Sequence, residues 1–159
     1  MKRTVRILVP ICTLMFLAAV MHGFAQPDFT GTWKMNASKS QFGPMPAPDS
    51  VTLKVEHKDP NLKTSMTTVG GPQGDQTVDA KYTTDGKECV NSIMGTDAKS
   101  KVTWDGDAMV TDTKVDFGGA EITLKAKWTL SSDGKVLTNA QKISTPQGEF
   151  EIVYVFDKQ

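Results

Sequence analysis

The stretch EITLKAKWTL, residues 121–130, alternates between apolar or small side chains and polar ones. The apolar or small side chains fall on one face of an extended chain: Ile122, Leu124, Ala126, Trp128 and Leu130. A period of two is typical of a β-strand that covers a core with one face and meets water with the other. The outward face is polar, whereas an outer-membrane barrel needs an apolar outer band. We therefore expect any barrel built from such strands to be surrounded by water.

The same alternation recurs along the chain from residue 26 onward. Two clear examples are SVTLKVEHK, residues 50–58, and EFEIVYVF, residues 149–156. Asp-Gly pairs at residues 85–86, 105–106 and 133–134 tolerate the backbone angles of tight hairpins. Together the pattern predicts ten strands, over residues 29–36, 50–58, 61–69, 75–84, 87–94, 97–104, 107–117, 120–131, 134–144 and 148–157.

Short connections make consecutive strands antiparallel neighbours, which gives an up-and-down meander. A meander of eight to ten strands removes its two free edges by closing into a barrel. No long segment shows helical periodicity. We therefore expect residues 26–159 to form one all-β domain, a single antiparallel up-and-down β-barrel.

One segment, SKSQFGPMPAPDS at residues 38–50, does not fit the strand pattern. Prolines at three alternate positions exclude both a central strand and a helix interior. We expect a long extended connection between the first two strands. Two interpretations remain open: a surface strap, or a flap over the barrel mouth with Phe42 and Met45 as an apolar lid.

The first 25 residues have the features of a secretory signal peptide. Three basic side chains precede an apolar run over residues 7–20, and Gly23 and Ala25 form a small-x-small cleavage signature. We expect cleavage after Ala25, a secreted or periplasmic protein, and no membrane span afterwards. An uncleaved anchor is the alternative, but a proline, a threonine and a histidine interrupt the segment.

Cleavage would change the charge of the chain. Lys2, Arg3 and Arg6 leave with the leader, so 15 of the 18 lysines and arginines remain against 18 acidic side chains, a net charge of −3. No arginine is left, and this balance argues against nucleic-acid binding. Cys89 becomes the one cysteine, so an intramolecular disulfide is excluded. We expect Cys89 to be a small buried residue, with a reactive thiol as the alternative.

Catalytic groups are scarce. His57 is the one histidine beyond residue 25, so any Ser-His-Asp, Cys-His or zinc arrangement must include it. The motifs of metalloproteases, P-loop proteins and α/β-hydrolases do not occur. We therefore expect that the protein is not an enzyme and that it binds neither a cofactor nor a metal. An isomerase or cyclase, or a haem protein with His57 as axial ligand, is the less favoured alternative.

The expected inner faces combine apolar side chains with a few neutral polar ones, which is the usual composition of a small-ligand site. We predict a ligand-binding set of His57, Met66, Tyr82, Asn91, Trp104, Met109, Thr111, Trp128 and Tyr154. The ligand would be small and hydrophobic or amphipathic, and the cavity several hundred Å³ in volume. Without arginine, a neutral ligand is favoured over a fatty-acid anion. In the alternative, the side chains fill the barrel and the protein is a non-catalytic structural or interaction module of the cell envelope. The sequence does not give an oligomeric state.

The stretch FTGTWK, residues 29–34, resembles the first strand of lipocalins and intracellular fatty-acid-binding proteins, which belong to the calycin superfamily. The chain is also similar to small secreted lipocalin-like proteins of bacteria. The resemblance implies that Trp33 plugs the closed end of the barrel and that Gly31 allows close approach of the backbone beside it. Lipocalins pack an arginine of a late strand across the tryptophan, and here Lys142 or Lys158 would have to take that place.

The resemblance also bears on the ligand. Fatty-acid-binding proteins commonly hold the ligand carboxylate with an arginine-x-tyrosine pair near the C-terminus. The matching positions in this chain are Ile152 and Tyr154, and isoleucine offers no charge to a carboxylate. Those proteins also insert two helices after the first strand, where this chain has the proline-rich segment. The resemblance therefore implies a related barrel with a different entrance and a different ligand chemistry.

Overall fold

The computed structural model describes residues 26–159, so the expected leader and its cleavage signature lie outside the described residues. The described part of the chain is built from ten strands and contains no helix long and apolar enough to cross a membrane. The strands are β1 (Gly31–Met35), β2 (Ser50–Lys58), β3 (Asn61–Gly71), β4 (Gly74–Thr83), β5 (Glu88–Ile93), β6 (Thr96–Asp105), β7 (Ala108–Phe117), β8 (Ala120–Leu130), β9 (Val136–Thr145) and β10 (Gly148–Lys158).

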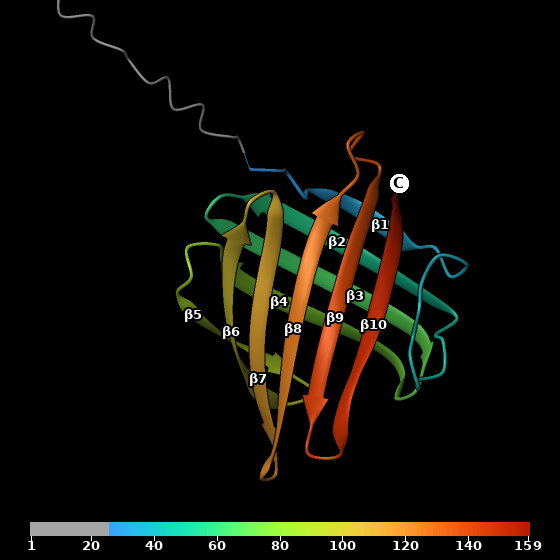
Figure 1. Ribbon diagram of the computed structural model, residues 1–159, viewed down its shortest axis with the longest axis vertical. Helices are drawn as coiled ribbons and strands as arrows, with labels where there is room; N and C mark the ends of the chain where they lie inside the picture. The colour runs from blue at the N-terminus through green and yellow to red at the C-terminus, as the bar shows by residue number, and fades with distance from the viewer. Residues whose placement is uncertain (1–25) are drawn as a thin grey trace, which may run out of the picture.

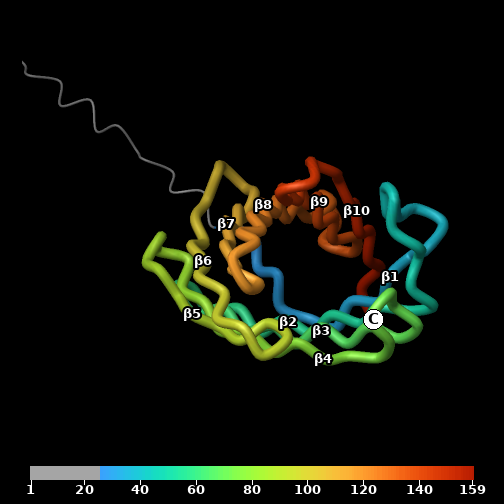
Figure 2. Tube along the Cα trace, turned by 90° about the horizontal axis from the view of Figure 1, so that it is seen from below, coloured from blue at the N-terminus to red at the C-terminus, as the bar shows by residue number. Residues whose placement is uncertain are grey.

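All ten strands belong to one antiparallel sheet in the order β4-β3-β2-β1-β10-β9-β8-β7-β6-β5. β1 pairs with β2 on one side and with β10 on the other, so the first and last strands lie side by side. Strands β7 to β10 form one wall, and β1 to β4 cross behind them at a steep angle (Figure 1). Viewed end-on, the chain forms a ring (Figure 2). The expected all-β up-and-down barrel is confirmed.

One expected neighbour pair is not hydrogen-bonded as a ladder. β4 and β5 are consecutive in the chain, yet they are the two ends of the sheet. The backbone of the turn between them forms hydrogen bonds with other segments. Thr84 N–H donates to the Pro60 carbonyl at 2.8 Å, and Gly86 N–H donates to the Val102 carbonyl of β6 at 2.9 Å. The expectation that all consecutive strands pair was therefore wrong at this one place. The barrel is nearly closed, with a seam between β4 and β5.

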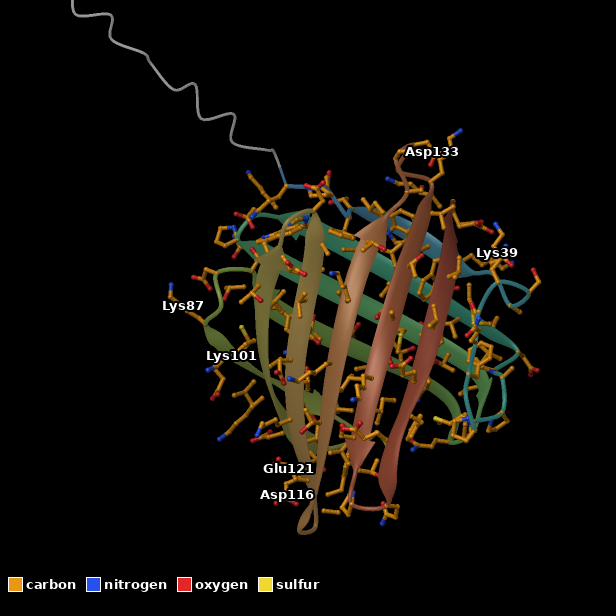
Figure 3. The ribbon with its side chains drawn as sticks, viewed as in Figure 1. Lys39, Lys87, Lys101, Asp116, Glu121 and Asp133 are labelled. Carbon is orange, nitrogen blue, oxygen red and sulfur yellow. The ribbon has the colours of Figure 1, made fainter. Side chains whose placement is uncertain are left out.

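The hydrophobic core contains residues of β1 and of most other strands. The largest fully buried side chains include Trp33, Phe29, Phe156, Leu62 and Met109. They come from the alternate inward positions that the period of two predicted. Charged side chains project outward around the barrel (Figure 3). This arrangement is what the polar outer face of residues 121–130 predicted.

The proline-rich connection lies along β10 as a strap. Its backbone pairs with Val153 in both directions at Gln41, with N···O distances of 2.8 and 2.7 Å. Phe42 is half-buried against the Tyr154 ring, with 5.6 Å between ring centroids. Gly43 has φ 56°, and a Cβ there would lie 2.7 Å from the Glu151 carbonyl oxygen. The backbone of the strap continues the edge that β1 leaves open along β10, while Phe42 packs against the hydrophobic core cluster. The first contact fits the surface strap and the second fits the apolar lid, so both interpretations stay open.

Candidate ligand-binding site

A cavity of about 130 Å³ lies inside the barrel between β2 to β5 on one side and β7 to β9 on the other, and it is partly open to solvent. Its lining combines aliphatic, aromatic and neutral polar side chains: Leu53, Leu62, Thr64, Met66, Val78, Ala80, Tyr82, Ile93, Thr111, Thr113, Leu124, Ala126, Trp128, Asn139 and Gln141. None of the lining side chains carries a charge. The cavity is therefore suited to an uncharged molecule.

The polar groups of the lining differ in how they are satisfied. Thr113 shares a buried hydrogen bond of 2.8 Å with Ser100. Burial raises the pKa of the Tyr82 hydroxyl above its usual value of 10, with a smaller contribution from the nearby Cys89 thiol. The Asn139 carbonyl oxygen is buried and accepts no hydrogen bond from the described residues. Tyr82 and Asn139 therefore offer neutral polar groups to the lumen.

The cavity is smaller than the several hundred Å³ expected from the sequence. Ligand pockets usually measure about 300–1,000 Å³, whereas a cavity of about 150 Å³ holds a molecule of the size of benzene. The reason lies in the closed end, where Phe29, Trp33 and Phe156 occupy the lumen with no exposed surface. The barrel is neither hollow throughout nor completely filled.

Four of the nine predicted ligand-binding residues line this cavity: Met66, Tyr82, Thr111 and Trp128. The structure places the other five outside it. Met109 is fully buried in the core, and Trp104 packs against Phe29 with 6.0 Å between ring centroids. Tyr154 lies between Phe42 and Phe156, its pKa raised by burial. His57 packs against Phe29 and Trp104, and Asn91 bonds to Lys81 across the β4–β5 seam.

The closed end is built around Trp33. Its Nε1–H donates to the Phe29 carbonyl at 3.0 Å, and its ring is covered by the Lys158 ammonium at 5.1 Å from the centroid. Lys158 thus takes the place that the lipocalin resemblance assigned to an arginine, whereas Lys142 pairs with Glu149 at 2.6 Å. Gly31, at φ 154°, leaves room for the Lys158 side chain, because a Cβ at this position would lie 2.9 Å from the Lys158 Cε.

His57 lies at the end of β2 beside Asp59, and its side chain is buried, with 4% exposed. Nδ1 accepts the Phe29 N–H at 3.5 Å, and Nε2 is 4.0 Å from a carboxylate oxygen of Asp59. A shallow pocket at this end is lined by Gln26, Asp28, His57 and Asp59. The His57 ring packs against Trp104 in a tilted arrangement, with 5.7 Å between ring centroids, which gives it a structural role in the closed end.

Asn91 faces the β4–β5 seam, which we define as Lys81 and Thr83 of β4 with Cys89 and Asn91 of β5. The Asn91 amide accepts from Lys81 N–H at 2.8 Å and donates to the Lys81 carbonyl at 3.0 Å. Thr83 N–H donates to the Cys89 sulfur at 3.3 Å. Side chains thus replace the missing backbone ladder. Cys89 is half-buried and hydrogen-bonded, and not the plain buried apolar residue expected.

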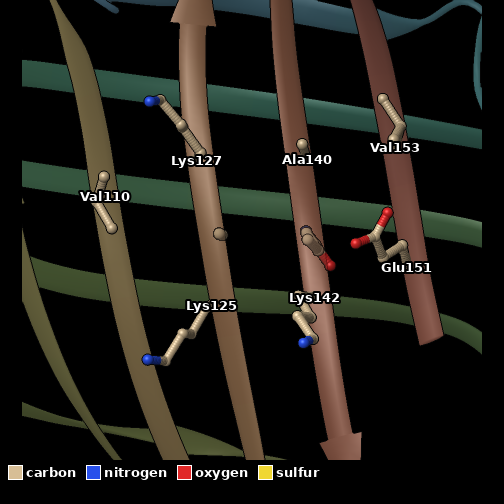
Figure 4. A pocket seen from close by; sticks show the side chains of 9 residues that line it. Val110, Lys125, Lys127, Ala140, Lys142, Glu151 and Val153 are labelled. Atoms are coloured by element: carbon tan, nitrogen blue, oxygen red, sulfur yellow. The ribbon is translucent and has the colours of Figure 1, made fainter. Parts of the chain in front are cut away.

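A second depression lies on the outer wall, across β7 to β10, with a volume of about 260 Å³ (Figure 4). Its floor is Val110, Ala140 and Val153, and lysines stand around it. Lys125 pairs with Asp112 of β7 at 3.5 Å, and Lys127 pairs with Asp105 at the end of β6 at 2.9 Å. Because these cations are already paired, the depression is an ordinary part of the solvated face, and it does not resemble an anion site.

The predicted ligand-binding set omitted four polar residues of the cavity: Thr64, Thr113, Asn139 and Gln141. A signal for two of them was present. Leu137, Asn139 and Gln141 alternate along β9, so the period that placed the leucine inside also placed the two amides there. Polar residues at inward positions of a strand are the residues to examine for a ligand site.

No group of three or more histidine, cysteine, aspartate or glutamate side chains in residues 26–159 is arranged to hold a metal ion. His57 has neither a serine nor a cysteine among its hydrogen-bond partners. A catalytic triad through His57 is therefore not assembled in this structure.

The architecture is similar to several solved structures. A secretory abundant heat soluble protein of Ramazzottius varieornatus superposes with a TM-score of 0.58 at 13% identity, over 82% of this chain and 94% of that one. The zebrafish ileal bile acid-binding protein, complexed with cholic acid, gives 0.57 at 17% identity, over 82% and 98%. Fatty-acid-binding protein 1 of Echinococcus granulosus gives 0.52 at 15%, over 82% and 96%. No family model matches the chain, and no curated protein matches it in sequence.

These similarities define the class of fold. The chain has the calycin-type barrel of fatty-acid-binding proteins and secretory abundant heat soluble proteins. The resemblance inferred from residues 29–34 is thereby confirmed for the fold. At identities of 13–17% the likeness does not extend to a ligand.

Proposed function

We propose that this chain is a binding protein that holds a small apolar or amphipathic molecule inside its barrel. The observation that carries the proposal is the uncharged cavity, with Leu53, Leu62 and Trp128 as apolar walls and Tyr82 and Asn139 as neutral polar groups. An apolar cavity with a few convergent polar groups is the usual form of a small-ligand site. Two proteins of the same fold are named for bile-acid and fatty-acid binding, which also supports the proposal.

The ligand is bound and released unchanged. Proton transfer requires a group placed beside the reacting atom, and the cavity lining contains no histidine, cysteine, aspartate or glutamate. The binding energy would come from burying apolar surface against Met66, Leu124 and Trp128, at about 25 cal/mol for each Å². A molecule much larger than benzene would fit only if side chains at the open side, such as Ile93, moved aside.

The protein acts outside the cytoplasm. Support comes from the basic, apolar and small-residue segments within residues 1–25, which form a secretory signal. The test is the mass of the protein isolated from its own cells. Cleavage after Ala25 would leave a chain that begins at Gln26, whereas an intact leader in the mature protein would contradict this proposal.

Binding is tested by native mass spectrometry of the protein purified from its own envelope. A bound molecule that survives gentle ionisation and leaves on activation would give the mass and class of the ligand. The companion measurement is thermal unfolding against a panel of neutral alcohols, phenols, sterols and fatty acids, because a ligand that binds the folded state raises the midpoint. A binding protein should show either a co-purified ligand or a saturable shift.

The small volume of the cavity favours a second candidate, a structural or interaction module whose barrel is mostly filled. This candidate predicts no co-purified molecule and no thermal shift with any member of the panel. It also predicts that substitutions enlarging the cavity only lower stability. A saturable shift that is lost on Trp128→Ala but kept on an exposed control such as Val90→Ala would exclude it.

A further inference from the structure

Asn139 is a buried polar residue in the middle of an otherwise regular strand. It lies on β9 directly opposite Trp128 of β8 and Tyr154 of β10. The residue is 4% exposed and lines the cavity. Its carbonyl oxygen is buried and has no hydrogen-bond partner among the described residues. Asn139 therefore lies at the cavity wall with a side-chain acceptor that has no partner.

An unused acceptor of this kind is costly in a folded protein. A buried polar group without a partner loses its hydrogen bonds to water and gains none in return. Leucine or valine at the same position would remove that cost and add apolar contact with Trp128. Most buried polar groups in proteins do have a partner, so an exception calls for an explanation. A hydrogen-bond donor supplied by a bound ligand would explain this exception.

The surroundings of Asn139 define what that ligand must carry. Its oxygen needs a hydrogen-bond donor. No lysine, arginine or histidine lines the cavity, so a carboxylate would be buried without a counter-charge. Thr111 and Tyr82 add hydroxyl groups that can donate or accept at the same cavity. The lining thus fits a neutral group that both donates and accepts, such as a hydroxyl.

We propose that Asn139 is the anchor that orients the ligand, and that the ligand is an uncharged amphiphile with a hydroxyl or amide donor, not a carboxylate. This inference rests on the proposed function and specifies it. In a site for anions, a charged residue pair selects the ligand by its charge. Here Asn139 would select the ligand by hydrogen bonding. A ligand without a donor fits the cavity but leaves the Asn139 oxygen unsatisfied.

The test compares phenol with toluene, which have similar shape and differ in one donor, and adds benzoate as the anion. Binding to the leaderless chain, residues 26–159, is followed by NMR titration. We expect phenol to bind the wild type, and benzoate at pH 7 not to bind. Asn139→Leu should lower the preference for phenol over toluene about three- to tenfold, the effect of one net hydrogen bond. Asn139→Val serves if leucine does not fit.

Thermal unfolding gives an independent readout. If the acceptor is unused in the free protein, Asn139→Leu raises the unfolding midpoint, by about 3–6 °C. Asn61→Leu removes the same amide from an exposed position and should change neither the midpoint nor the preference. A lower midpoint for Asn139→Leu would show that the amide is a structural bond, made directly or through an enclosed water, and would overturn the inference.

The two failures can be told apart. If neither phenol nor toluene binds the wild type, ligand binding in this cavity fails, and the inference fails with it. If both bind and Asn139→Leu leaves their ratio unchanged, the binding proposal stands and the role of Asn139 is overturned. Tight benzoate binding at pH 7 would also overturn it, because an anion would then be held without the neutral donor.

Discussion

The closed end and the β4–β5 seam are held together in opposite ways. At the closed end, β1 is paired on both sides, with β2 and β10, and it carries Trp33 into the core. At the seam no backbone ladder joins the strands, and the Asn91 amide and the Cys89 sulfur make the contacts instead. One region is fixed by the core and the sheet together, the other by a few side chains.

The difference indicates which part of the barrel opens first. A region with few buried contacts and exposed hydrogen bonds opens locally at a lower free energy than the global unfolding of the domain. Val78 of β4 and Ile93 of β5, which lie on the two strands that the seam joins, line the cavity. Substitutions at the closed end should therefore change global stability, whereas substitutions at the seam should change local opening.

The largest effect should come from removing the plug. Trp33→Ala leaves a cavity where a fully buried indole packs and donates to the Phe29 carbonyl. We expect the free energy of unfolding, measured by urea denaturation, to fall by about 3–5 kcal/mol. Val90→Ala, at a position 56% exposed, should change it by less than about 0.5 kcal/mol. Similar values for the two variants would show that Trp33 does not fix the closed end.

The next effect tests the lysine that covers the plug. Lys158→Met keeps an apolar chain over the indole but removes the charge that lies 5.1 Å from the ring centroid. Because the site is exposed, we expect a loss of about 0.5–1 kcal/mol in the free energy of unfolding. Lys158→Arg should keep that stability, since guanidinium groups stack well on aromatic rings. A loss as large for arginine as for methionine would exclude the cation–π contribution.

The sequence predicted the strands well because strands depend on local pattern. The alternation in β8 and β10 correctly places Trp128, Ile152 and Phe156 among the buried residues. The Asp-Gly pairs mark turns whose glycines have positive φ, such as Gly106 and Gly134. All ten expected strands occur, with bounds that differ by a few residues. The resemblance carried by the FTGTWK stretch marks β1, the strand that bears the fully buried Trp33.

The seam and the cavity lining could not be predicted in the same way. Whether β4 and β5 pair depends on where their connecting turn bonds, and Thr84 and Gly86 bond to Pro60 and Val102. No local pattern encodes those distant partners. Alternation also says that a residue points inward, not whether it reaches a cavity or a filled core. Met109 and Thr111 share a face of β7, yet only Thr111 lines the cavity.

The seam is tested by Asn91→Ala, which removes both hydrogen bonds to Lys81. Water can reach the freed groups, so we expect global stability to fall by only about 1 kcal/mol. Hydrogen exchange at the Lys81 amide should become faster, while amides of β1 keep their protection. Ser92→Ala, on the exposed face of the same strand, is the control. Equal acceleration in β1 and β4 would mean that the seam does not open separately.

The smallest effect concerns Asp85, in the turn that joins β4 to β5. Hydrogen bonds from Lys87 and Thr83 lower the pKa of its carboxyl group from an ordinary 3.8 to about 2. A lowered pKa in the folded state means that the stabilisation is present above about pH 4 and is lost as the pH falls toward 2. NMR titration of the Asp85 carboxyl should show the low midpoint, and Lys87→Met should raise it. Asp85→Asn should speed hydrogen exchange of the turn amides at pH 6 but make no difference near pH 2.

The turn is exposed, so this small pH effect should stay at the seam and leave the closed end unchanged. A matching loss of protection around Trp33 would show that the two regions open as one unit.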